Sequence, residues 1–180
     1  HNLDQDIFEH ITHLQELYLD NNPFQIIHTS VLNAFSDLPQ LQVLDLTRCE
    51  LSELPDDIFH PLRALKTLYM GGNLFKSIPK ALKYARNVRE VVLDENPIED
   101  LSEKNAFPPM PNLERLNLTF IGSLRAIRKG AFAGLEKLNE LRLSHNHHLS
   151  YIDPSAFTFT EKDNSDILLW PPIKKLYLNN

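Results

Sequence analysis

Three closely spaced histidines are the residues of this chain that come nearest to a metal-binding motif. His145, His147 and His148 lie within four positions, and the nearest carboxylate belongs to Asp153. A structural zinc site needs four ligands, usually as two groups at defined spacing, and no second group follows at such a spacing. We therefore interpret these residues as solvated histidines of a turn and predict no metal and no other cofactor.

The sequence lacks the common motifs for catalysis. The sequence contains no G-x-S-x-G, no phosphate-binding glycine-rich loop, no H-E-x-x-H and no C-x-x-C. It has only five glycines and one cysteine, Cys49, so no disulfide can form within the chain. We predict that the protein is not an enzyme.

One short motif offers a modification. Asn117-Leu118-Thr119 is the only N-x-[ST] sequence with an allowed middle residue, and such an asparagine can carry a glycan in a secreted protein. An unused chance match is the alternative reading, and both stay open.

Composition narrows the class of protein. The 180 residues are 42% hydrophobic and 23% charged, with a net charge of -6, which is typical of a folded domain. The acidic balance lacks the basic footprint of a nucleic-acid-binding protein. No apolar run approaches the roughly 20 residues of a membrane span, so any membrane anchor would lie outside these residues.

The chain is organised around a repeat, seen most clearly over residues 41–54. This stretch has the form L-x-x-L-x-L-x-x-C-x-L-x-x-L, which is one copy of a leucine-rich repeat. In it the alternation Leu44-Asp45-Leu46 predicts a short strand with the two leucines on one face. Further copies begin at Leu14, Leu65, Val88, Leu113, Leu138 and Ile173.

Stacking of these copies predicts the fold class. A single copy cannot bury its apolar face, so neighbouring copies must stack on one another. We expect an α/β leucine-rich repeat solenoid, a horseshoe with a parallel concave sheet of about seven strands and an irregular or short-helical convex side. It should be one domain over residues 1–180, cut in mid-repeat at both ends, before His1 and after Asn180.

Two further columns of residues support this alignment. Apolar side chains that should fill the convex side lie six and three residues before each copy. The first of these slots holds mostly Phe, and the second includes Ile11. Before the last copy the two slots hold Ile167 and Trp170. A second column should lie inside the turns and bond the backbone of adjacent coils; it consists of Asn22, Cys49, Asn73, Asn96 and Asn146. Ile121 interrupts it, so that coil must satisfy its turn in another way, which flexible Gly122 would help.

The last copy is preceded by extra residues. It begins 35 residues after its predecessor, whereas the others are 23 to 27 apart. The surplus, about residues 158–166, is polar, and we expect an exposed loop. A protruding contact finger is one interpretation, and a tolerated surface insertion is the favoured one.

The repeats resemble the typical extracellular leucine-rich repeat family over the whole chain. The resemblance rests on residues 54–59, 127–135 and 143–157, where a phenylalanine spine follows each turn. Similar repeats occur in Toll-type receptor ectodomains, Slit-like guidance proteins and secreted invertebrate immune proteins. The resemblance implies a secreted or cell-surface protein that binds other proteins. Leu82, Ile121 and the 158–166 insertion depart from the pattern.

The solvent face of the predicted strands is the candidate site. We hypothesise a protein-binding patch there, centred on Tyr69 and Val92 beside a bare Gly71-Gly72, because exposed tyrosines favour interfaces. The candidate residues on this face are Tyr18, Val43, Asp45, Tyr69, Val92, Asp94, Arg115, Arg142 and Tyr177.

The functional expectation is therefore a recognition module without catalysis. It would be an extracellular receptor ectodomain or a secreted immune or adhesion glycoprotein that binds a protein ligand or co-receptor, with homo- or heterodimerisation as a further option. The alternative is an intracellular scaffold or inhibitor of a signalling protein with the same fold.

Overall fold

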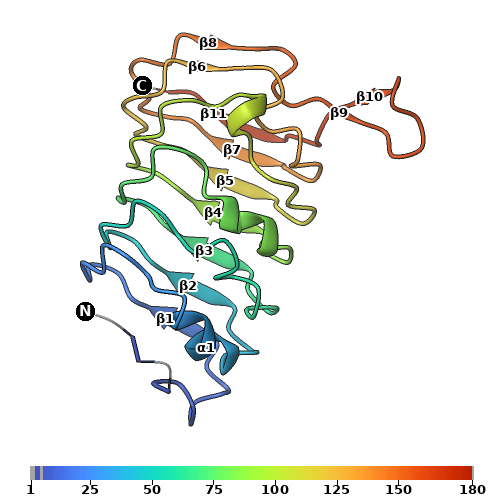
Figure 1. Cartoon of the computed structure of the whole chain (residues 1–180). Helices are drawn as coiled ribbons and strands as arrows, with labels where there is room; N and C mark the ends of the chain where they lie inside the picture. Colours follow the sequence, from blue (N-terminus) through green and yellow to red (C-terminus); the bar gives the residue numbers. More distant parts are fainter. Residues whose placement is uncertain (1–2, 5, 180) are drawn as a thin grey trace.

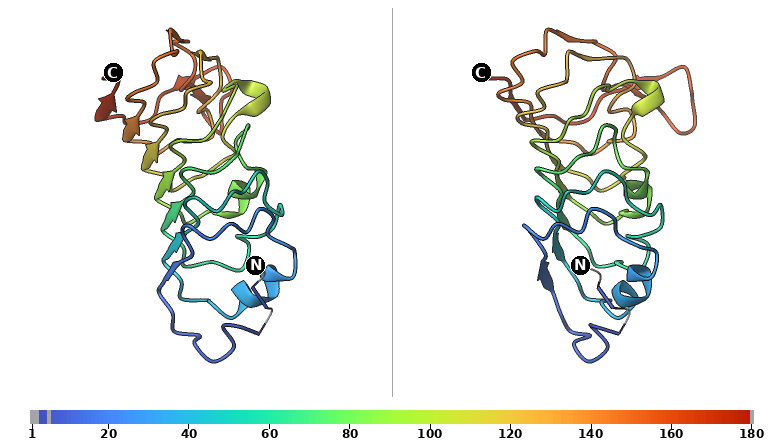
Figure 2. Two further views of the ribbon diagram at one scale, coloured as in Figure 1. Left: turned by 90° about the vertical axis from the view of Figure 1, so that its left-hand side faces the viewer. Right: turned by 60° about the vertical axis from the view of Figure 1, so that its left-hand side comes forward.

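The computed structural model describes residues 3–4 and 6–179. Seven three-residue strands form one parallel sheet in the order β1-β2-β3-β4-β5-β7-β11, and the returning segments lie on its other side (Figures 1 and 2). These strands are β1 Glu16–Tyr18, β2 Val43–Asp45, β3 Thr67–Tyr69, β4 Glu90–Val92, β5 Arg115–Asn117, β7 Glu140–Arg142 and β11 Lys175–Tyr177. The prediction of a leucine-rich repeat solenoid with about seven parallel strands is confirmed.

Register follows from the leucines at the strand centres. Leu44 pairs with Leu17 and Leu68, and Leu116 with Val91 and Leu141. All of these central residues except Leu17 are buried. A shift by one residue would turn every one of them to water, at a cost of about 1.5–3 kcal/mol for each side chain.

The convex side contains short helices and small sheets. The helices are α1 Val31–Ser36 and the 3-10 helices Lys80–Tyr84 and Glu103–Asn105. The strands β6 Ala126–Ile127 and β8 Tyr151–Ile152 pair in parallel. They occur in the copies that begin at Leu113 and Leu138, whose turns are one residue longer than in the other copies.

The phenylalanine spine continues past the last regular copy. The rings of Phe107 and Phe132 stack with centroids 5.9 Å apart, and Phe132 and Phe157 stack at 5.1 Å. The assignment of Ile167 and Trp170 to the same core slots is wrong, because both are exposed, Trp170 by 61%. Ile11 is also exposed, since it lies in the first coil and has a neighbour on one side only.

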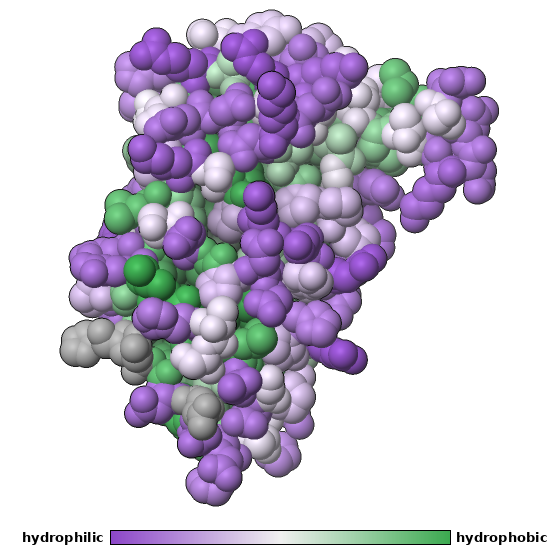
Figure 3. Space-filling view, viewed as in Figure 1, coloured by the Kyte–Doolittle hydropathy of each residue, from purple (hydrophilic) through white to green (hydrophobic). Residues whose placement is uncertain are grey.

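The insertion before the last copy forms a β-hairpin that projects from the stack. Strand β9 Phe159–Thr160 pairs antiparallel with β10 Leu168–Leu169, so the exposed segment has regular strands at its base rather than being a loop throughout. Figure 3 shows an apolar base and a polar tip. A groove of about 620 Å³ lies between this hairpin and the neighbouring coils, lined among others by Phe107, Pro109 and Phe159.

Asparagines in the turns connect successive coils. The Nδ2 of Asn73 donates to the carbonyls of Leu46 (2.8 Å) and Met70 (3.0 Å), and its Oδ1 accepts from the amides of Cys49 (3.0 Å) and Leu51 (3.1 Å). Asn96 and Asn146 bond the preceding coil in the same way. Asn22, in the first coil, is exposed, and among the described residues its side chain bonds only its own turn, through the carbonyls of Leu19 and Asp20.

Cys49 occupies the same column as a buried thiol. Its Sγ donates to the carbonyl of Leu19 at 3.2 Å. Burial raises the pKa of this thiol to about 11, so it stays protonated at neutral pH. A protonated, buried thiol is a poor nucleophile, and the residue acts as part of the core.

Candidate binding face

Strand register gathers the predicted site residues into columns on the solvent face of the seven-stranded sheet, called the sheet face below. Because side chains alternate along a strand, the third residue of each strand lies beside the third residue of the next. The central column consists of Tyr18, Asp45, Tyr69, Val92, Asn117, Arg142 and Tyr177. Val43 and Arg115 lie in the column on one side of it, and Asp94 follows strand β4 on the other side.

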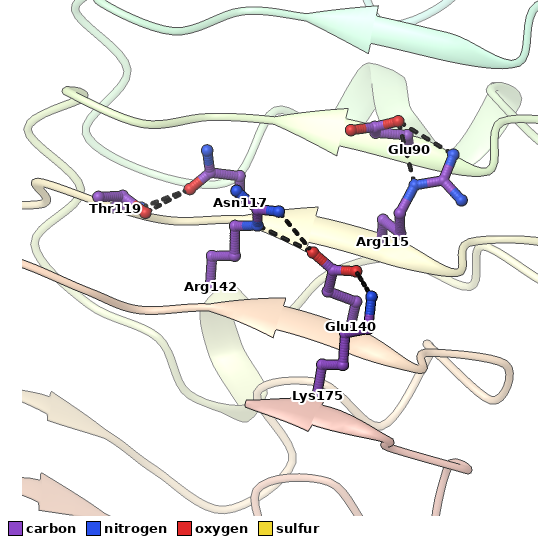
Figure 4. Close-up of polar contacts among 7 residues, drawn as sticks. All are labelled: Glu90, Arg115, Asn117, Thr119, Glu140, Arg142 and Lys175. Carbon is purple, nitrogen blue, oxygen red and sulfur yellow. Dashed lines mark hydrogen bonds and ion pairs between the residues drawn. The ribbon is translucent and has the colours of Figure 1, made fainter. Parts of the chain in front are cut away.

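The half of the sheet face made by β4, β5, β7 and β11 holds paired charges (Figure 4). Arg115 donates from Nε and Nη2 to Oε2 of Glu90, at 3.1 and 3.0 Å. Arg142 Nη2 lies 2.8 Å from Oε1 of Glu140, and Lys175 Nζ lies 3.5 Å from its Oε2. Glu90 and Glu140 are therefore neutralised by bases of the chain itself.

Glu140 is the centre of this network, and the repeat pattern does not distinguish it from other charged residues. Its side chain is only 10% exposed. The hydrogen bond from Arg142 lowers the pKa of Glu140, and the charges of Arg142 and Lys175 act in the same direction against the opposing effect of burial. Arg142 lies two residues away on the same strand, and Lys175 lies 35 residues away on the next strand. Only the strand register shows that both bases meet at Glu140.

The half made by β1, β2 and β3 is different in character. Tyr18 is 58% exposed, and Tyr69 is half-buried two strands away, with Asp45 between them. Asp45 accepts a hydrogen bond from the backbone amide of Thr47 at 2.8 Å. Among the described residues it forms no ion pair with a lysine or arginine. This half thus presents aromatic rings and an uncompensated carboxylate.

The expected bare surface at Gly71 and Gly72 is not bare. A Cβ added at Gly71 would collide with the carboxylate of Asp94, and one at Gly72 would lie 2.6 Å from Cγ of Arg48. The guanidinium of Arg48 continues to Glu95, at 3.3 Å. The missing glycine side chains therefore make room for Asp94 and for an ion pair. Burial, followed by the charge of Glu95, raises the pKa of Asp94.

The sequon asparagine faces solvent beside the charged network. Oδ1 of Asn117 accepts from the amide and hydroxyl of Thr119, at 3.0 and 2.5 Å. In the part of the chain that the structure describes, its Nδ2 donates no hydrogen bond to another residue. A hollow of about 110 Å³ surrounds it, lined among others by Glu90 and Arg142.

The histidine cluster has an aromatic neighbour instead of further ligands. The His145 ring stacks on Phe120 with centroids 4.6 Å apart, and the ring of His147 lies 6.4 Å from that of His145. Within residues 3–4 and 6–179, no group of three metal-binding side chains is close enough to hold an ion. In the same range, no helix has the length and apolar content needed to cross a bilayer.

Comparison with known families agrees with this geometry. The leucine rich repeat family model matches residues 1–51, 12–75, 39–98, 86–147 and 111–161. The chain therefore belongs to the leucine-rich repeat family.

Similar proteins include several receptors and surface proteins. The zebrafish (Danio rerio) transforming growth factor beta activator LRRC33 is 32% identical over 109 residues, 59% of this chain and 16% of that protein. The mouse (Mus musculus) CD180 antigen is 30% identical over 141 residues, 76% of this chain and 21% of the antigen. In a crystal structure of a TLR13-ssRNA13 complex, the similar chain is 27% identical with a TM-score of 0.80, covering 98% of this chain and 23% of that one. The chain thus spans less than a quarter of each.

Proposed function

We propose that this chain is a non-catalytic recognition module that binds a protein ligand or co-receptor on its sheet face. The observation that carries this proposal is the row Tyr18, Asp45, Tyr69 and Val92 on four adjoining strands. Tyrosines that combine an apolar ring with a polar tip are enriched at protein interfaces and at their energetic hot spots. A rigid sheet presents them in fixed positions, which lowers the entropic cost of binding.

A protein ligand fits this face better than a nucleic acid. The similar TLR13 chain was solved with a single-stranded RNA, but phosphate recognition depends on lysine and arginine side chains that neutralise the backbone. Here Glu16, Asp45 and Asp94 would repel phosphates, and the basic residues of the other half are already paired.

We further propose an extracellular location, as a receptor ectodomain or a secreted immune or adhesion protein. Supporting this are the resemblance of the repeats to extracellular ones and the names of similar proteins, such as the mouse thyrotropin receptor. The alternative is an intracellular scaffold or inhibitor. A leader peptide or capping cysteine clusters in the complete gene product would favour the first, and cytosolic expression of the complete product would favour the second.

Glycosylation at Asn117 forms part of this proposal. The side chain of Asn117 is half-exposed, and among the described residues its Nδ2 donates no hydrogen bond. This nitrogen, to which a glycan attaches, is therefore accessible. A glycan there would cover the paired-charge half and leave Tyr18, Asp45 and Tyr69 open.

Site-directed photo-cross-linking tests the recognition proposal. A photoreactive phenylalanine analogue replaces Val92 on the sheet face or, as the control, the exposed Lys80 on the convex side. We expect the Val92 probe to form a covalent adduct with one defined protein on cells that bind the chain, and the Lys80 probe to form none. Adducts from Lys80 alone would place binding on the other surface and contradict the proposal.

A further inference from the structure

One arginine of this chain already shows how a cation is held on the central column. The guanidinium carbon of Arg142 lies 5.0 Å from the ring centroid of Tyr177, while its Nη2 lies 2.8 Å from a Glu140 carboxylate oxygen. The cation therefore contacts an aromatic face and a carboxylate together. A cation within about 6 Å of a ring centroid is attracted by the ring quadrupole.

The opposite end of the same column has the rings and the carboxylate without the cation. Tyr18, Asp45 and Tyr69 are direct neighbours in register. Strands in a sheet lie about 4.8 Å apart, so the two tyrosines start from backbones about 9.6 Å apart. The Asp45 side chain starts between them, so a cation that bonds its carboxylate comes close to both rings. The hydroxyl of Tyr18 donates to Oε2 of Glu16 on the same strand, at 2.9 Å. Val43 lies two residues before Asp45 on strand β2 and on the same face of the sheet.

The charged side chains that share the sheet face with these rings on β1 to β4 are acidic. The relevant positions are the first and third residues of each of the strands β1 to β4 and the second residue after each strand. They hold no base and five acids, which are Glu16, Asp20, Asp45, Glu90 and Asp94. Burial and then the charges of Glu90 and Asp45 raise the pKa of the Tyr69 hydroxyl.

The flanking bases of this half are engaged elsewhere. Arg48 pairs with Glu95 at 3.3 Å, and Lys66 Nζ donates to Gln42 Oε1 at 3.2 Å. Glu90 is compensated by Arg115, but no base of the described chain compensates Asp45. The electrostatic complement of the slot is therefore a cation supplied by another molecule.

We propose that Tyr18, Asp45 and Tyr69 form a slot for an arginine side chain on a basic segment of the protein ligand. The guanidinium lies between the two rings and donates hydrogen bonds to the Asp45 carboxylate, as Arg142 does with Tyr177 and Glu140. Arginine fits better than lysine because its flat, weakly hydrated group stacks on rings and bonds a carboxylate with two donors. The inference rests on the proposed function, since it names the chemistry that the same face recognises.

Peptide titration monitored by NMR tests the slot directly. The ¹⁵N-labelled protein is titrated with the acetylated and amidated peptide Gly-Gly-Arg-Gly-Gly and with its citrulline counterpart, which has the same shape and no charge. We expect the arginine peptide to shift the amide signals of residues 16–18, 43–45 and 67–69 and to leave those of 140–142 unchanged. Equal shifts with the citrulline peptide, shifts confined to 140–142, or none at all would overturn the proposal.

Variants then assign the contributions of the side chains. Tyr69→Leu should weaken arginine binding about two- to fivefold, the range for one exposed cation–ring contact, and Asp45→Ser should weaken it at least as much. Serine at 45 can still accept the Thr47 amide, so the turn is retained. Tyr151→Leu and Asp163→Ser, both at exposed positions away from the sheet face, are the matched controls and should leave the affinity unchanged. Equal losses in the controls would show a non-specific effect and refute the slot.

The outcome is separable from that of the recognition proposal. A Val92 cross-link to a protein, without arginine-specific shifts, would leave the recognition function standing and remove the slot. Arginine-specific shifts at the slot without any cross-link would support the slot and count against recognition of a protein by this face.

Discussion

The side-chain oxygen of Asn146 accepts a hydrogen bond of 2.6 Å from the backbone nitrogen of Ile121, one coil earlier in the solenoid. Nδ2 of the same asparagine donates to the carbonyls of Leu118 and Leu143, both at 2.9 Å. The coil that lacks its own turn asparagine is thus satisfied by the next one. The left-handed residue of this turn is Phe120, whose φ is 58°. Gly122 does not have a positive φ, so its flexibility is not what satisfies the turn.

The first prediction is that Asn146→Ala lowers the free energy of unfolding by about 2–4 kcal/mol, because it leaves buried backbone groups of two coils unpaired. Urea denaturation measures the change. Asn22→Ala is the matched control: that exposed side chain bonds only its own turn, so the loss should be below about 1 kcal/mol. Equal losses for the two variants would show that bonding between coils has no special weight.

The second prediction concerns Glu140 and pH. Its folded pKa is lowered from the ordinary value of 4.5, so its charge contributes stability above that value and the contribution is lost as pH falls through the folded pKa. We expect Glu140→Gln to cost about 0.5–1 kcal/mol at pH 7 and progressively less below about pH 4.5. Urea denaturation of both proteins across pH 3–7 measures the difference. A difference that does not vary with pH would mean that packing rather than charge is responsible.

The third prediction compares two glycines. Gly72 has φ +63° and a neighbouring Arg48 side chain, whereas Gly122 has no atom within 4 Å of an added Cβ and no positive φ. Gly72→Ala should cost about 1–2 kcal/mol. Gly122→Ala should be neutral or stabilise by up to about 1 kcal/mol, because it restricts the unfolded chain. Thermal unfolding of both variants decides this, and a loss as large at Gly122 would contradict the geometric argument.

The fourth prediction concerns the sequon. Protein secreted from a eukaryotic host should carry a glycan at Asn117 that peptide N-glycosidase removes, and Thr119→Val should abolish it because the hydroxyl is part of the acceptor motif. Intact-mass spectrometry distinguishes the species. Unmodified Asn117 in most of the secreted wild-type material would refute this prediction.

An engineered glycan extends this test to the sheet face. Asp45→Asn converts Asp45-Leu46-Thr47 into a second sequon at the centre of the aromatic half, and Asp163→Asn creates one at the hairpin tip as the control. Under the recognition proposal, the first glycan should block cell binding and the second should leave it unchanged. Blocking by the Asp163→Asn glycan alone would instead identify the hairpin as the contact surface.

The solenoid follows from the repeat pattern of the sequence. The alternation at residues such as Leu44 and Leu46, repeated every 23 to 27 positions over the first six copies, allows one register in which the strand leucines of the inner coils are buried together. It also placed the nine candidate residues on one face, because the side-chain period of a strand is two. These are local properties that stacking repeats propagate, so the pattern of one coil applies to the others.

Contacts between coils depend on the folded structure, because the periodic pattern does not encode them. Trp170 fits a core slot by spacing, yet the hairpin before it carries the chain outward and leaves the ring in solvent. Gly71 suggests a gap, yet Asp94 from the next coil fills it. Arg115 reaches Glu90 on the next strand at 3.0 Å, while among the described residues Asp45 has no base as a partner, since pairing depends on which side chains meet across coils. The repeat sets where each side chain starts, and packing between coils sets which partner it meets.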